Sequence, residues 1–139
     1  MRRLHDAEIE QLLSSDALAR VATVDAEGFP HVTPLWFVWA AGTFYLTSYV
    51  GRPHLNRIAR NPRVGLVIDV EAALRPDGER PNKQIRVIGD ATVAPDPDNV
   101  WTDRIRAKYL GATLPKGRAG RGRALVTLTP RELTAVASV

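Results

Sequence analysis

The 139-residue chain has no cysteine, one methionine, and only three residues each of tryptophan, tyrosine and phenylalanine. Without cysteine, disulfide bonds and thiol catalysis are excluded. No apolar run reaches the roughly 18 to 20 residues that a membrane-spanning helix needs. The opening residues MRRLHDAEIEQLL also lack the apolar segment of a secretory signal. We therefore expect a soluble, cytoplasmic protein with no membrane partner.

Several catalytic motifs are also missing. The sequence contains no Gly-x-Gly-x-x-Gly or Walker motif and no serine in a nucleophile elbow, so a P-loop and covalent hydrolysis have no support. The three histidines, His5, His31 and His54, fall in different predicted elements and have no carboxylate cluster beside them. No metal site is expected.

The composition is that of a folded, basic domain. Hydrophobic residues make up 45% of the chain and charged residues 24%, which predicts a single domain over residues 1–139. The net charge of +4 suits an anionic ligand. Because the chain is short for a complete active site, we expect a site shared by two subunits. Nucleic-acid binding is the less favoured alternative, because the basic cluster at 116–123 lacks interleaved aromatic residues.

Residue periodicity predicts a mainly antiparallel β protein. Helices are expected at 6–14, at 53–60 and from Pro97 to about Leu110, with Asp96 as the N-cap of the last. Strands are expected at 19–25, 30–40, 43–48, 63–71 and 83–94, with a final pair at 124–130 and 132–138. So many short strands in one run favour a small barrel, which removes its edges by closure.

Two residues inside predicted strands restrict how those strands can pair. Pro34 lacks an N–H, so its strand must lie at a sheet edge or bulge there. Gly89 in mid-strand predicts a bulge or the close approach of another backbone. Around Pro34, the backbone of Leu35 and Trp36 is then free to meet a planar heteroaromatic ring, although the aromatic residues here could equally be core.

The segment from 44 to 64 predicts an anion site. A strand ends in Thr47 and Ser48, and after a glycine turn Arg52 precedes a helix that begins at Pro53 and carries His54. The first N–H groups of a helix are unpaired and its dipole attracts negative charge, so a phosphate group fits there. The alternative is that the hydroxyls only cap the helix.

Three stretches together resemble the pyridoxamine 5′-phosphate oxidase-like, FMN-binding split β-barrel superfamily. They are RVATVDAEGFPHVTPLWF, TSYVG followed by NRIARNPRV, and KQIRVIGDATV, and the resemblance covers about residues 7–110. It implies a six-stranded antiparallel split β-barrel with a few short flanking helices. It also implies a homodimer with cofactors in two clefts at the subunit interface.

The resemblance implies eight cofactor-binding residues. Phosphate and ribityl contacts would fall on the strand end and the helix start, ring contacts on the backbone of the second strand, and a further polar contact on the fifth strand. The chain departs from the family at Pro53 and His54, where adjacent basic residues are common, so Arg52 would supply most of the positive charge. In chain order the implied residues are Pro34, Leu35, Trp36, Thr47, Ser48, Arg52, His54 and Gln84.

The implied activity is an oxidoreductase that uses FMN, or alternatively the deazaflavin F420, to move hydride to or from a small planar substrate. Vitamin B6 oxidation is not expected, because the substrate-binding C-terminal segment has no counterpart after Gly111. The cations Lys116, Arg118, Arg121 and Arg123 could attract the polyglutamate tail of F420. A non-catalytic protein that binds flavin, haem or another tetrapyrrole remains the alternative.

Overall fold

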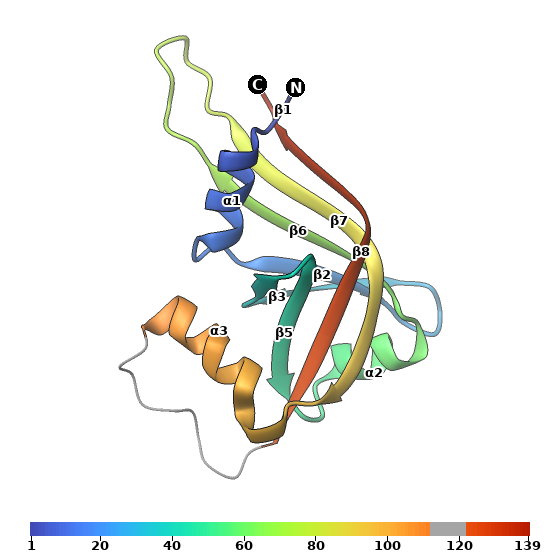
Figure 1. Cartoon of the computed structure of the whole chain (residues 1–139). Helices are drawn as coiled ribbons and strands as arrows, with labels where there is room; N and C mark the ends of the chain where they lie inside the picture. The colour runs from blue at the N-terminus through green and yellow to red at the C-terminus, as the bar shows by residue number, and fades with distance from the viewer. Residues whose placement is uncertain (112–121) are drawn as a thin grey trace.

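The computed structural model describes residues 1–111 and 122–139. That part of the chain forms eight strands, three α-helices and one 3-10 turn (Figure 1). The strands are β1 (Arg2–Arg3), β2 (Ala19–Val24), β3 (Pro30–Leu35), β4 (Val38–Ala40), β5 (Thr43–Tyr49), β6 (Arg63–Glu71), β7 (Asn82–Pro95) and β8 (Arg123–Ala137). The helices are α1 (Asp6–Ser14), α2 (Pro53–Arg60) and α3 (Val100–Leu110), and the 3-10 turn η1 spans Pro97–Asn99.

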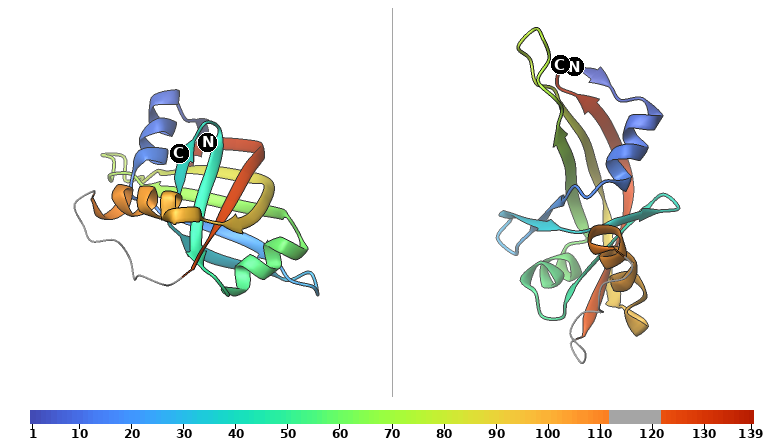
Figure 2. Two further views of the ribbon diagram at one scale, coloured as in Figure 1. Left: turned by 60° about the horizontal axis from the view of Figure 1, so that its bottom comes forward. Right: turned by 90° about the vertical axis from the view of Figure 1, so that its left-hand side faces the viewer.

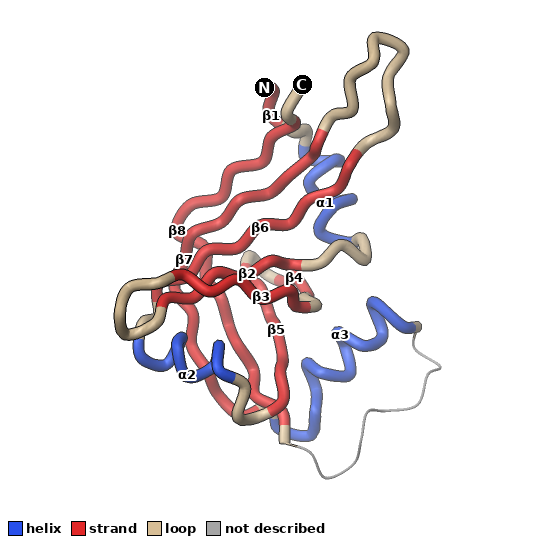
Figure 3. The backbone as a smooth tube through the Cα atoms, turned by 180° about the vertical axis from the view of Figure 1, so that it is seen from behind, coloured by secondary structure: helices blue, strands red, loops and turns tan. Residues whose placement is uncertain are grey.

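All strands belong to one antiparallel sheet in the order β3-β2-β6-β7-β8-β5-β4, and β1 pairs with β8. The two ends of this order, β3 and β4, are consecutive in the chain and separated only by Trp36 and Phe37. The ends of the sheet must therefore come close together, and the sheet curls around its core as a barrel does (Figures 2 and 3).

The resemblance implies six strands and periodicity predicts seven, whereas the described residues contain eight. One strand that neither count includes is β1, which is only two residues long and pairs Arg2 with Ala137 at the end of β8. A second additional strand arises because the expected strand at 30–40 breaks at Trp36 and Phe37 into β3 and β4. Periodicity misses this break, because the residues on both sides keep the composition of a strand.

The expected final pair of strands is a single strand, β8. Its register against β7 shifts between Ile88, which pairs with Glu132, and Gly89, which pairs with Pro130, so Arg131 is the extra residue of a bulge. A proline there predicts a strand end, because it lacks an N–H, but the bulge accommodates it and the strand continues.

The predictions for Pro34 and Gly89 are confirmed. Pro34 lies in β3, which is one edge of the sheet. A Cβ at Gly89 would lie 2.4 Å from the backbone oxygen of Thr129. Only glycine permits this approach of β8 to β7 without a shift of the backbone.

The last helix begins later than predicted. Asp98 and Asn99 have positive φ angles of 56° and 55°, so Pro97–Asn99 form a 3-10 turn and α3 starts at Val100. Asp96 nevertheless caps α3 through its buried side chain, which accepts hydrogen bonds from the backbone N–H groups of Trp101 and Thr102 at 3.1 and 2.8 Å. The charge also suits the positive end of the helix dipole.

The core fills the inside of the curled sheet. Its largest fully buried side chains come from β5, β6, β7 and β8 and from the break between β3 and β4, and each contributes about 1.5 to 3 kcal/mol. Helix α2 covers one end with Leu55 and Ile58, which anchors the start of α2 beside the end of β5. Within the described ranges, no helix is long and apolar enough to cross a membrane. The large, fully buried core side chains of these strands and of the β3–β4 break are Phe37, Phe44, Leu46, Leu66, Ile68, Ile85 and Leu128.

Candidate cofactor-binding site

A cleft lies where β3 and β5 approach each other without pairing, between helices α2 and α3. It consists of two cavities of about 530 and 240 Å³ that share the lining residues Pro34, Leu35, Thr47 and Arg123. The larger cavity extends to the start of α2 and the smaller one to α3. We call the two together the β3–β5 cleft.

The structure brings seven of the eight predicted site residues together in this cleft. Gln84 is the exception, because it lies on β7, where its amide donates to Asn82 at 2.9 Å and accepts from Arg86 at 2.5 Å. The cofactor-binding role of all eight residues stays a prediction. The seven residues that line the cleft are Pro34, Leu35, Trp36, Thr47, Ser48, Arg52 and His54.

Ser48 and His54 form a buried pair on the wall of the larger cavity. The hydroxyl oxygen of Ser48 lies 2.7 Å from Nε2 of His54, and both residues are buried. Arg52, the N-cap of helix α2, makes no side-chain cap bond, and the Ser48 hydroxyl bonds the ring of His54. Pro53 occupies the first turn, where its missing N–H costs no helical bond.

Four arginines line the cleft, whereas no carboxylate from the described residues does. Arg57 donates from Nε to the buried hydroxyl of Thr23 at 2.8 Å, which fixes its side chain and leaves its terminal nitrogens available. Arg123 lies over the ring of Tyr49 at 3.7 Å, and Arg52 lies 6.0 Å from the same ring. Like charges held this close repel one another, and a bound anion would relieve the repulsion. The fourth arginine that lines the cleft is Arg106.

The aromatic residues around the strand break have different roles. Phe37 is fully buried, and Trp39 packs on Phe44 with ring centroids 4.6 Å apart, so both belong to the core or its edge. Trp36 is 37% exposed and lines the smaller cavity. Its ring stacks on Tyr109 at 4.8 Å with an interplanar angle of 5°. Of these aromatic residues, Trp36 is the one that lines the cleft.

A comparison with models of protein families identifies the family of this chain. The family model for pyridoxamine 5′-phosphate oxidase matches residues 5–137, almost the whole chain. The chain belongs to the pyridoxamine 5′-phosphate oxidase family. A search of curated proteins finds no match.

Solved structures with a similar fold have names that point to different functions. An F420 reductase is 24% identical with a TM-score of 0.68, and the match covers 89% of this chain and 94% of that one. An FAD-binding protein from Mesorhizobium loti is 20% identical with a TM-score of 0.71, covering 99% and 98%. The heme storage protein HutZ from Vibrio cholerae is 19% identical with a TM-score of 0.68, covering 95% and 94%. These likenesses show the fold alone.

Two arginines of this family member's cleft were not predicted as phosphate contacts. Arg57 follows His54 by three positions on α2, so helical spacing places both on one face and is a signal that could have found it. Arg123 was assigned with a basic cluster whose other members, at 116, 118 and 121, lie outside the described residues. It reaches the cleft because it is the register partner of Tyr49, a pairing across 74 residues with no local signal.

His54 makes the stability of the fold depend on pH. Burial, and then the charges of Arg57 and Arg52, lower the pKa of His54 below its ordinary value of 6.5. As pH falls through 6.5, His54 binds a proton in the unfolded chain but stays neutral in the folded chain. The free energy of unfolding should therefore decrease as the pH is lowered from 6.5 to the lowered pKa. Urea unfolding at pH 7.5, 6.5 and 5.5 measures it. His54→Gln should reduce this slope, and an unchanged slope would contradict the assignment.

Proposed function

We propose that this protein is a homodimeric oxidoreductase that binds FMN or F420 in the β3–β5 cleft and moves hydride to or from a small planar substrate. The observation that carries the proposal is the lining of the cleft. Arginines meet the N-terminus of a helix at one end, Leu35, Trp36 and Ile105 supply apolar surface at the other end beside Arg106 and Arg123, and no described carboxylate lines either part. A molecule with a phosphate group and a flat ring fits both ends.

The larger cavity suits the phosphate group. Arg52 precedes the first turn of α2, where unpaired backbone N–H groups and the helix dipole favour an anion. Arg57 presents its terminal nitrogens from the same helix, and charge-assisted bonds to phosphate are among the strongest in proteins. Thr47 and Ser48 line the same cavity, and their hydroxyls would make weaker contacts to a polyol chain.

The smaller cavity suits the ring. Leu35 and Ile105 supply apolar surface, and β3 is an edge strand whose outer backbone groups can bond a polar ring edge. When bound, the isoalloxazine or deazaflavin ring supplies the hydride chemistry. The chain's own residues would hold and orient the ring. The Trp36 side chain, which lines this cavity, would limit the entry of water beside a planar substrate.

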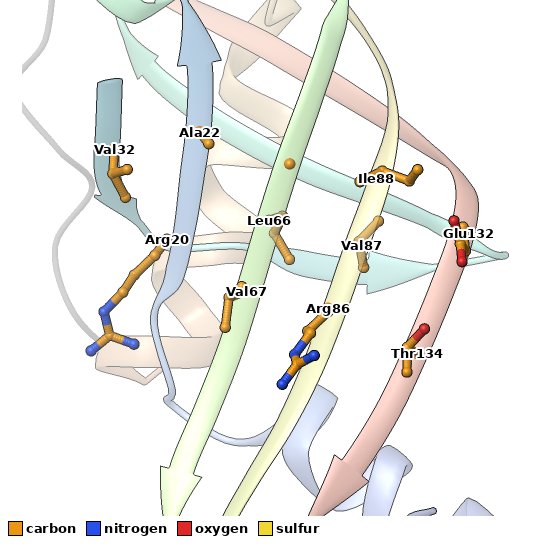
Figure 4. Close-up of a pocket in the computed structure, with 11 residues that line it drawn as sticks. Arg20, Ala22, Val32, Leu66, Val67, Arg86, Val87, Ile88, Glu132 and Thr134 are labelled. Atoms are coloured by element: carbon orange, nitrogen blue, oxygen red, sulfur yellow. The ribbon is translucent and has the colours of Figure 1, made fainter. Parts of the chain in front are cut away.

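The outer face of the sheet supports the dimer. A second hollow of about 620 Å³ lies across β3, β2, β6, β7 and β8 (Figure 4). Val32 and Ile88 are 63% and 54% exposed on it, and the opposite charges of Arg86 and Glu132 lie on the same face. An apolar patch with both charge signs can pair with itself about a two-fold axis.

Ile88→Asp is expected to convert the dimer to a monomer. The substitution would place a carboxylate in the apolar centre of the interface, where burying an unpaired charge costs several kcal/mol, about enough to undo micromolar association. Sedimentation velocity measures the outcome. Leu74→Asp, at an exposed residue in the β6–β7 loop, is the matched control and should stay dimeric. A dimeric Ile88→Asp variant would refute this interface.

Turnover tests the proposed activity. The bound cofactor is reduced anaerobically, and its reoxidation is followed by absorbance with a panel of quinones and nitroaromatic compounds. An oxidoreductase should show rates that differ by at least about tenfold between acceptors at equal driving force. A non-catalytic carrier, the alternative favoured by the likeness to a heme storage protein, should show no acceptor-specific rate.

A further inference from the structure

The break between β3 and β4 leaves the backbone of Phe37 without a strand partner. Side chains of α3 form hydrogen bonds with it instead. The N–H of Phe37 donates to the hydroxyl of Tyr109 at 3.3 Å, and its carbonyl accepts from Nζ of Lys108 at 3.0 Å. Phe37 is fully buried, so unpaired backbone groups there would be costly. Two consecutive side chains of α3 thus replace the sheet at this point.

The same two side chains also bind the segment at the end of α1. Nζ of Lys108 donates to the carbonyl of Leu13 at 3.0 Å, and the hydroxyl of Tyr109 donates to the carbonyl of Ala17 at 2.8 Å. Lys108 and Tyr109 therefore bridge two backbone segments that no strand pairing joins. We call these two residues the α3 bridge.

Charge and burial agree with this geometry. Nζ of Lys108 lies 3.6 Å from the centroid of the Phe37 ring, a cation–π contact. Burial lowers the pKa of Lys108 to about 8 and raises the pKa of Tyr109 to about 12. Near neutral pH most Lys108 side chains keep their charge and Tyr109 keeps the proton that it donates.

Tyr109 connects the bridge to the cofactor cleft. Its ring is the one that stacks on Trp36, and both Trp36 and Ile105 of α3 line the smaller cavity. We propose that Lys108 and Tyr109 are positioning residues that fix the Trp36 ring and thereby the width of the ring-binding part of the cleft. The cofactor part of this inference rests on the proposed function, whereas the Trp36 part does not.

The chain offers a matched control in Tyr45 of β5, which stacks on Trp101 of the same helix, α3. Tyr45 stacks on Trp101 with ring centroids 3.7 Å apart and an interplanar angle of 9°, but neither residue lines the cleft. Tyr45→Phe removes a hydroxyl from a tyrosine–tryptophan stack, as Tyr109→Phe does. If loss of a tyrosine hydroxyl disturbed α3 in general, the disturbance would appear in both variants. An effect specific to the cleft would appear only in Tyr109→Phe.

The experiment reads Trp36 directly. The protein is labelled with 5-fluorotryptophan, which gives three fluorine resonances, and Trp36→Phe identifies the one from Trp36. Tyr109→Phe and Lys108→Met should shift or split that resonance while those of Trp39 and Trp101 stay in place. Both should weaken FMN or F420 binding by about three- to tenfold, the effect of one or two lost hydrogen bonds. Tyr45→Phe should change neither the Trp36 resonance nor the affinity.

The possible outcomes separate the claims. An unchanged Trp36 resonance in Tyr109→Phe, which keeps the ring and its packing even if Lys108→Met fails to fold, overturns the inference. A shifted resonance with unchanged cofactor affinity overturns the link to the cleft. If the unsubstituted protein binds neither cofactor but Tyr109→Phe still shifts Trp36, the proposed function fails and the positioning of Trp36 stands.

Discussion

Arg52→Ala is expected to weaken the binding of FMN or F420 by about 1.5 to 3 kcal/mol, which is roughly 10- to 150-fold in Kd. Arg52 is the N-cap of α2 and lines the larger cavity, so its guanidinium and the helix N-terminus face the same anion. Pro53 supplies no N–H, and burial lowers the pKa of His54, so neither replaces the lost cation near neutral pH. A fluorescence titration with each cofactor measures the change.

Arg60→Ala is the control for this result. Arg60 is exposed in the last turn of the same helix and does not line the cleft, so its loss changes the net charge equally without touching the site. Its Kd should stay within about twofold of the unsubstituted protein at 0.15 M salt, where distant surface charges are screened. Equal losses from Arg52→Ala and Arg60→Ala would mean that only the overall charge matters and would remove Arg52 from the site.

Gly89→Ala should destabilise the fold by at least about 1 to 3 kcal/mol, the usual cost of overpacking. The added Cβ would lie 2.4 Å from the oxygen of Thr129 and 3.1 Å from Cα of Pro130, so it meets backbone that can yield only if the bulge moves. Because β7 and β8 share a long register, a shift there would strain pairing on both sides. Urea unfolding at pH 7.5 measures the loss.

Gly65→Ala, on the neighbouring strand β6, is the matched substitution. Its Cβ would lie 3.7 Å from the oxygen of Val87 and 3.8 Å from Cβ of Ala22, which are ordinary contacts. We expect a change of less than about 1 kcal/mol, and stabilisation is possible because alanine restricts the unfolded chain more than glycine does. A similar cost at both positions would contradict the role given to the bulge.

The elements that local sequence determines were predictable. The helix at 53–60 and most strands follow from periodicity, proline and glycine, because those signals act within a few residues. The break at Trp36 and Phe37 was not, because its backbone is paired by Lys108 and Tyr109, some 70 residues away. The continuity of β8 through Pro130 likewise depends on a bulge whose partner is a strand far along the chain.

The candidate site divides in the same way. Thr47, Ser48, Arg52 and His54 belong to one strand-turn-helix segment, so the sequence alone predicts that they lie together. Their meeting with Leu35 and Trp36 required the family resemblance, since it depends on how the sheet curls. Gln84 lies on β7 outside the cleft of the single chain, and its cofactor contact stays a prediction.

Separate titrations of the purified protein with FMN and with F420, followed by the change in absorbance of the cofactor, test the central claim most directly. We expect saturable binding of at least one of them at one molecule per chain, weakened by Arg52→Ala and unaffected by Arg60→Ala. If neither cofactor saturates the protein at millimolar concentration, the β3–β5 cleft is not a flavin or deazaflavin site and the proposed function is wrong.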